Sequence, residues 1–278
     1  MTQPTATRPV GVDELRRAWH AVQDGHFRTR EPRSGRQLHT RAQATTGEWI
    51  SSEPVLPVLG CAGQSGTTTV ALALATVSGS ARVVECCTAT ASGLAAAATA
   101  ELGRGENAWA LGRRDRVWMA RTSQVLLLPD ETPLPDSPPA GVDLTVLDIG
   151  WEIGQVMASG GWIRDQVESA SSLVLVTTPT VPAMRRLEMA LTLLDPQKIA
   201  VAVRGTHPRR WPKALLASLG SRSSAAVQDG PVVAIPSDKG LLLRGLDSSP
   251  LPASLLKAAE NLLEHTASGL HHQKGPQP

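Results

Sequence analysis

The chain has 278 residues, 41% of them hydrophobic, so it is long enough to bury a sizeable core. A formal net charge of +2 is too small to indicate a nucleic-acid partner by itself. The three cysteines, two of them adjacent, do not make a disulfide framework, and no stretch approaches the roughly 20 apolar residues of a membrane span. The N-terminus carries no apolar signal core, so we expect a soluble, cytoplasmic protein without a membrane partner.

The first 52 residues differ in pattern from the rest. After a tail over 1–10, apolar and charged residues alternate at helical spacing over 12–22, which predicts one short amphipathic helix. Residues 28–41 are rich in arginine and contain one acid, Glu31. A solvated basic linker is the more common explanation of such a run, and contact with DNA is the alternative.

Residues 53–268 alternate short apolar runs with segments of helical pattern. Apolar strands separated by helices predict an α/β fold, a mostly parallel sheet with helices on both faces. The segment 103–124 reads as a hairpin or an irregular excursion, and 269–278 as a disordered tail. The expected strands are 55–60, 82–87, 125–129, 143–150, 173–179, 198–205 and 231–236, and the expected helices are 67–77, 92–102, 182–194, 211–220 and 252–266.

The turn after the first predicted strand has the residues of a phosphate-binding loop. Such loops need glycines that let backbone N–H groups wrap a phosphate, a helix N-terminus, a lysine, and a hydroxyl for Mg²⁺. Gly63 and Gly66 have the required spacing, and Thr68 stands at the hydroxyl position. Thr67 occupies the position of the lysine. A tight strand-to-helix turn without any ligand explains the two glycines equally well.

The segment AGQSGTTT (62–69) resembles the loop K-G-G-x-G-K-T-T of ParA/MinD-like (SIMIBI-class) P-loop ATPases, and it aligns without a gap. The two lysines of the family's loop fall on Ala62 and Thr67, and its second glycine falls on Gln64. Three more segments resemble the family's second acidic strand, its strand–helix unit and its late I-P-x-D turn. They are VLDIG (146–150), the segment 171–194 with VTTP, and VVAIPSD (232–238).

The resemblance implies a P-loop NTPase architecture that binds ATP or ADP with Mg²⁺. It places Asp148 as the catalytic acid and, with Thr68, as a magnesium ligand. Of the family's acids after the second strand, the first falls on Glu85 and the second on Cys87, so one acid is missing. The nucleotide-binding positions that it implies are Gly63, Gln64, Ser65, Gly66, Thr67, Thr68, Thr69, Arg204, Pro236 and Asp238.

The missing lysines decide the functional prediction. Loss of one pre-aimed cation costs about 3–4 kcal/mol of transition-state stabilisation, so we expect weak or absent hydrolysis. Backbone N–H groups and the helix dipole still favour an anion. We therefore predict a pseudo-ATPase that serves a protein partner as a scaffold or regulator, in plasmid or chromosome maintenance or in DNA transfer. The family's first lysine reaches across a nucleotide-sandwich dimer, so Ala62 argues against that homodimer.

Two other hypotheses stay open. In the first, the chain is an active or regulatory ATPase in which an arginine such as Arg82, Arg113 or Arg114 replaces the lysine. In the second, it is a nucleic-acid-associated module that acts through the arginine-rich segment 28–41. Arg185 and Arg186 lie where DNA-binding relatives carry basic residues, although an exposed helix face explains them equally well. The abundance of alanine and arginine is typical of a GC-rich, for example actinobacterial, genome.

Overall fold

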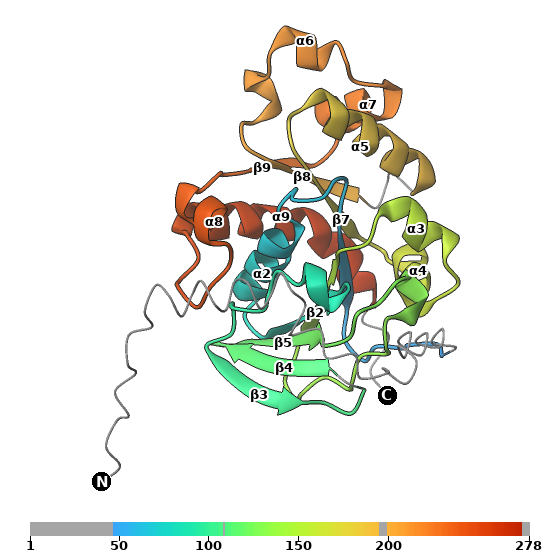
Figure 1. The fold of residues 1–278 in the computed structure, drawn as a ribbon. Coiled ribbons are helices and arrows are strands. Elements are labelled where there is room, and N and C mark those ends of the chain that lie inside the picture. Colours follow the sequence, from blue (N-terminus) through green and yellow to red (C-terminus); the bar gives the residue numbers. More distant parts are fainter. Residues whose placement is uncertain (1–46, 108, 195–198, 274–278) are drawn as a thin grey trace, which may run out of the picture. The chain divides into compact units, whose positions relative to one another are not determined.

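The structure is a computed structural model, and it describes residues 47–107, 109–194 and 199–273 (Figure 1). The predicted helix over 12–22 and the arginine-rich segment 28–41 lie outside the described residues. The described part is built on one sheet of nine strands, in the order β3-β4-β5-β2-β6-β1-β7-β8-β9. The strands are β1 (Val55–Gly60), β2 (Ala81–Cys86), β3 (Ala100–Arg104), β4 (Trp109–Arg114), β5 (Val117–Thr122), β6 (Leu144–Ile149), β7 (Leu173–Thr177), β8 (Ile199–Arg204) and β9 (Val232–Ile235).

All neighbouring strands pair in parallel except β3 with β4 and β4 with β5. The predicted mostly parallel α/β sheet is therefore confirmed. The helices are α2 (Thr67–Val77), α3 (Ile153–Ala158), α4 (Trp162–Ser169), α5 (Val181–Leu193), α6 (Lys213–Leu216), α7 (Ser221–Asp229), α8 (Lys239–Arg244) and α9 (Ala253–Gln273), with 3-10 turns η1 (Ala89–Ala91), η2 (Pro129–Glu131) and η4 (Pro208–Arg210). No helix in the described ranges is both long and apolar enough to cross a bilayer.

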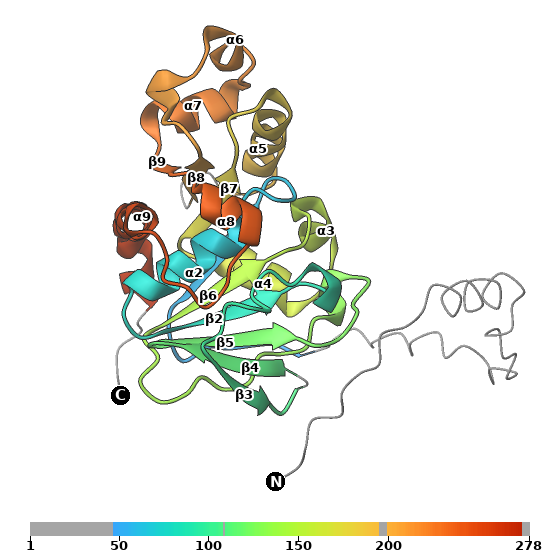
Figure 2. The same ribbon diagram turned by 60° about the vertical axis from the view of Figure 1, so that its left-hand side comes forward.

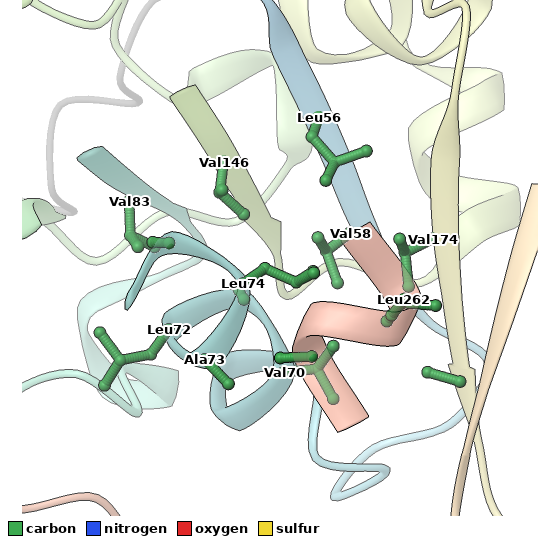
Figure 3. Close-up of a cluster of buried hydrophobic side chains, with 14 of the residues drawn as sticks. Leu56, Val58, Val70, Leu72, Ala73, Leu74, Val83, Val146, Val174 and Leu262 are labelled. Atoms are coloured by element: carbon green, nitrogen blue, oxygen red, sulfur yellow. The ribbon is translucent and has the colours of Figure 1, made fainter. Parts of the chain in front are cut away.

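Two apolar clusters cover the two faces of the sheet. On one face, α2 and α9 pack side by side over the central strands, and their leucines and valines meet Leu56, Val58 and Val146 (Figures 2 and 3). On the other face, α3, α4 and α5 cover the sheet around the fully buried Trp162. Because both faces are covered, the inner strands are apolar throughout, which is the pattern that made them recognisable in the sequence.

One predicted helix is wrong. The segment 92–102 is not a helix: it forms a turn after η1 and then enters the exposed edge strand β3. Glu85 accepts hydrogen bonds from the backbone N–H groups of Gly93 (2.6 Å) and Leu94 (3.0 Å), which holds this alanine-rich segment in a turn. The helix α9 also runs past Thr266, where we expected it to end, into the segment 269–278 that we expected as a tail.

The predicted strand 125–129 is also absent. The sheet position beside β2 belongs instead to β5, the second strand of the hairpin that was one of the two expectations for 103–124. In the segment 125–129 the backbone N–H groups of Leu127 and Leu128 donate to the Glu131 carboxylate, at 2.6 and 3.3 Å. Backbone groups bonded to a local carboxylate are not free for a strand ladder, and Leu127 is 72% exposed.

Candidate nucleotide-binding site

The loop between β1 and α2 has the backbone conformation of a tight anion-binding turn. Gly66, at the N-cap of α2, has φ of 97°, a left-handed conformation that glycine adopts without strain. Gln64, at the position of the family's second glycine, has φ of 59°. The Val70 N–H closes the first helical hydrogen bond to the Gly66 carbonyl at 3.0 Å. The amide groups of the first turn of α2 are thus directed into the loop, where they favour an anion.

The loop opens into a cavity of about 1100 Å³ at the carboxyl ends of β1, β6, β8 and β9. The sequence-predicted residues that line it are Gly63, Gln64, Ser65, Gly66, Thr67, Thr68, Thr69, Arg204, Pro236 and Asp238. Ligands of open parallel sheets bind at this edge. The structure thus brings together predicted residues from three separate strand ends, those of β1, β8 and β9. Asp148 is not a lining residue: it is 1% exposed.

The side chain at the lysine position is turned into the loop itself. Thr67 Oγ1 lies 3.0 Å from Ser65 Oγ, in a hydroxyl–hydroxyl hydrogen bond. Both hydroxyls lie over Gly60, where an added Cβ would clash with Thr67 Oγ1 and lie 2.8 Å from Ser65 Oγ. The loop therefore places no cationic side chain in the cavity, and two neutral hydroxyls occupy the interior of the loop.

Thr68 and Asp148 are the two residues that the family resemblance implies as magnesium ligands. The Thr68 hydroxyl is close enough to the Asp148 carboxyl group to oppose the rise in its pKa. Asp148 Oδ1 is buried and has no hydrogen-bond partner among the described residues. Mg²⁺ in nucleotide sites is bound by one or two protein oxygens together with phosphate and water. Thr68 lines the cavity and fits such an ion, whereas the buried Asp148 does not line it and acts on the ion only through Thr68. The described residues contain no cluster of three His, Cys, Asp or Glu that could hold a metal by itself.

Asp148 is paired with a second buried acid. Glu85 of β2 lies opposite Asp148 of β6 in the sheet register. Burial, and then the neighbouring Glu85 charge, raise the pKa of Asp148 to about 8, against the opposing effect of the Thr68 hydroxyl. Burial also raises the pKa of Glu85, although Ser92 and two backbone N–H groups bond to its carboxylate. Glu85 thus anchors the turn 92–94 and is itself buried.

The Asp148→Asn variant is expected to be more stable than wild type at pH 8. The ordinary carboxyl value is 3.8, so between about pH 4 and 8 folded Asp148 holds a proton that the unfolded chain releases. Stability therefore falls as the pH rises through this range, and the loss is complete above about 8. Asparagine resembles the protonated form and does not titrate. The free energy of unfolding of the variant, relative to that of wild type, should therefore be higher at pH 8 than at pH 5 by about 1 kcal/mol or more. Urea unfolding at the two pH values measures this, with exposed Asp229→Asn as control. A wild-type pH dependence as flat as the variant's would contradict it.

The three arginines proposed as substitutes for the lysine are engaged elsewhere, so that expectation is wrong in its choice of residues. Arg82 is buried in an ion pair with Glu53, at 3.0 Å. Arg113 lies over the ring of Trp118, and Arg114 donates to the carbonyl groups of Ala97 and Asp247. None of them lines the cavity.

Two other arginines do line the cavity, Arg186 of α5 and Arg204 of β8. The sequence pointed to Arg204 through its strand end. It also contained Arg186, but as one of a basic pair with no sign that it faces this site. The two acids of the cavity wall are helix caps: Glu152 accepts from the Gln155 N–H at 3.0 Å, and Asp238 from the Leu241 N–H at 2.8 Å.

The three cysteines are free and buried. Burial raises the pKa of the Cys61 thiol to about 12, and it also raises the pKa of Cys87. A thiol with a raised pKa carries little of the reactive thiolate. Cys61 and Cys87 therefore act as small buried side chains.

No protein-family model and no curated protein matches the chain. Solved structures of similar fold include the cell-division ATPase MinD of Pyrococcus furiosus, with 16% identity, a TM-score of 0.47, and coverage of 77% of this chain and 98% of that one. A Borrelia burgdorferi protein described as a plasmid partition protein, bound to AMPPNP, has 11% identity, a TM-score of 0.47 and coverage of 78% and 98%. The MinC:MinD complex of Aquifex aeolicus has 14% identity, a TM-score of 0.45, and coverage of 81% of this chain and 98% of that one.

These solved structures belong to the class of P-loop ATPases that the sequence resembles. At such identities and scores they describe a similarity of fold and carry no argument about ligands, partners or activity.

Proposed function

We propose that this chain is a degenerate ParA/MinD-like protein that binds ATP or ADP with Mg²⁺ and hydrolyses ATP weakly or not at all. The observation that carries the proposal is the Thr67 side chain, which is folded into the loop against Ser65 at the position of the lysine. The wrapped backbone, the helix N-terminus and the cavity needed for binding are retained. The cation that stabilises the transferring phosphoryl group is not supplied by the loop.

In this proposal the nucleotide is a ligand that sets the state of the protein. A protein that binds nucleotide without turning it over acts through a partner, so we propose a role as a scaffold or regulator for another protein. Plasmid or chromosome maintenance and DNA transfer are the processes in which the resemblance places it. A cytoplasmic location is part of the same proposal.

The proposal is tested by measuring binding and turnover on the same preparation. Isothermal titration with ATP and ADP in the presence of Mg²⁺ should show binding, and phosphate release should stay at the background level. Asp148→Ala should leave that background unchanged, as should Asp229→Ala, which removes an exposed acid outside the cavity. Turnover well above background that only Asp148→Ala abolishes would show an active ATPase. Absence of binding would show that the loop is only a turn.

A further inference from the structure

The stem of Arg204 passes directly beside the loop. Arg204 ends β8, and its Cδ would lie 3.4 Å from a Cβ added to Gly66, which makes this ordinary van der Waals contact. Gly66 is the residue from which α2 begins. A long cationic side chain on β8 thus reaches the backbone that would wrap a phosphate.

The charge of Arg204 is not used by the described part of the protein. Among those residues Arg204 has no ion pair and no side-chain hydrogen bond, whereas Arg82, Arg121 and Arg244 are paired with acids. The carboxylates of the cavity wall, Glu152 and Asp238, are bonded to helix N-termini. A half-buried arginine that lines a cavity and has no carboxylate partner favours an anionic ligand, because its planar donors match phosphate oxygens in pairs.

We infer that Arg204 supplies the phosphate-binding charge that the loop lacks at Thr67, and that Arg186, from α5, adds a second cation on the same cavity. The ligand is the polyphosphate chain of a nucleoside di- or triphosphate. The inference rests on the proposed nucleotide binding and assigns its electrostatic part to β8 and α5. In the family that the sequence resembles, an asparagine that often reads adenine falls near the position of Arg204. The contact between the Arg204 stem and Gly66 places the side chain at the phosphate end instead.

Three probes separate these roles: ATP, inorganic tripolyphosphate without a base, and adenosine without a phosphate. Arg204→Gln should weaken the binding of ATP and the binding of tripolyphosphate by a similar factor. We expect roughly 10- to 100-fold, the range for loss of a hydrogen bond to a charged group. Adenosine binding should not change. Arg204→Lys should retain part of the affinity. Arg185→Gln, which removes the exposed neighbour of Arg186 that does not line the cavity, should bind as wild type.

A second arm tests the replacement directly. Thr67→Lys restores a cation at the loop position, so the pair Thr67→Lys with Arg204→Gln should recover the tripolyphosphate affinity that Arg204→Gln loses. Thermal unfolding of each variant verifies that it is folded, and Arg204→Lys provides the measurement if Arg204→Gln does not fold.

Each result has a defined meaning. Equal affinity of wild type and Arg204→Gln for tripolyphosphate would overturn the inference while nucleotide binding stands. If Arg204→Gln lost affinity for ATP and adenosine but not for tripolyphosphate, Arg204 would contact the base, and the inference would also be overturned. If wild type binds neither ATP nor tripolyphosphate, the proposed function fails, and the inference fails with it.

Discussion

Glu53→Ala is expected to lower the free energy of unfolding by about 3–5 kcal/mol, the cost of removing one partner of a buried ion pair. Glu53 Oε1 accepts a hydrogen bond from the Arg82 guanidinium at 3.0 Å, and each side chain is only 5% exposed. Burial raises the pKa of Glu53, but the Thr145 hydrogen bond and the Arg82 charge outweigh it, so the net pKa is lowered. Without the carboxylate, Arg82 keeps its bonds to Thr145 and to the Asp136 carbonyl, but its charge is buried without an acid.

The matched control is Glu168→Ala, which breaks an ion pair of the same chemistry on the surface. Glu168 and Arg164 pair at 2.9 Å across one turn of α4, with both side chains well exposed. This variant should lose about 0.5 kcal/mol or less. Urea unfolding monitored by tryptophan fluorescence measures both changes. A Glu53→Ala effect no larger than that of Glu168→Ala would show that Arg82 finds water or another acid once Glu53 is removed.

The buried strands could be predicted from the sequence because both faces of the sheet are covered. A strand such as Leu173–Thr177, which is buried along its whole length, appears as an unbroken apolar run in the sequence. The edge hairpin gave a weaker signal, since β3 is exposed at every residue. The apolar run at 125–129 was misleading because its conformation is set by hydrogen bonds to Glu131 and not by the sheet.

The sequence predicted the residues of the candidate site that lie at strand ends, but not the one that lies within a helix. A rule about strand ends was enough to select Gly66, Pro236 and Asp238, which line one cavity. Arg186 could not be selected in this way because it projects from the middle of a helix, and only the packing of α5 brings it to the cavity. Arg82 shows the opposite case: the sequence named it as a conceivable cation for the loop but could not place it, and the parallel register sets it beside Thr145, at the start of β6.

The role of Gly60 also required the structure. As the last residue of a strand, it has no sequence feature that separates it from Gly63 or Gly66. In the fold, the hydroxyls of Thr67 and Ser65 lie directly against Gly60, where they leave no room for a side chain. The positions of the two hydroxyls are fixed, because Thr67 begins α2 and Ser65 is buried. They can keep these positions only if residue 60 has no side chain.

Gly60→Ala is therefore expected to disrupt the loop, with a loss of about 1–3 kcal/mol in stability from overpacking. The added methyl would clash with Thr67 Oγ1, lie 2.8 Å from Ser65 Oγ and lie 3.2 Å from the Ala62 carbonyl oxygen. Two of these three contacts are to short side chains and one is to backbone, so they can be relieved only if the loop moves. A displaced loop no longer presents its amides in one direction, so we expect at least about tenfold weaker binding of ATP or tripolyphosphate.

Gly63→Ala is the control, because an added Cβ at Gly63 meets no atom within 4 Å. It should change stability by no more than about 0.5 kcal/mol. Combining Gly60→Ala with Thr67→Ala removes the hydroxyl that the new methyl would clash with, so the double variant should recover part of the lost stability. Thermal unfolding and tripolyphosphate titration of the four proteins separate these effects. If Gly60→Ala and Gly63→Ala behaved alike, the hydroxyl pair would not determine the shape of the loop, and the substitution at Thr67 would have to act through charge alone.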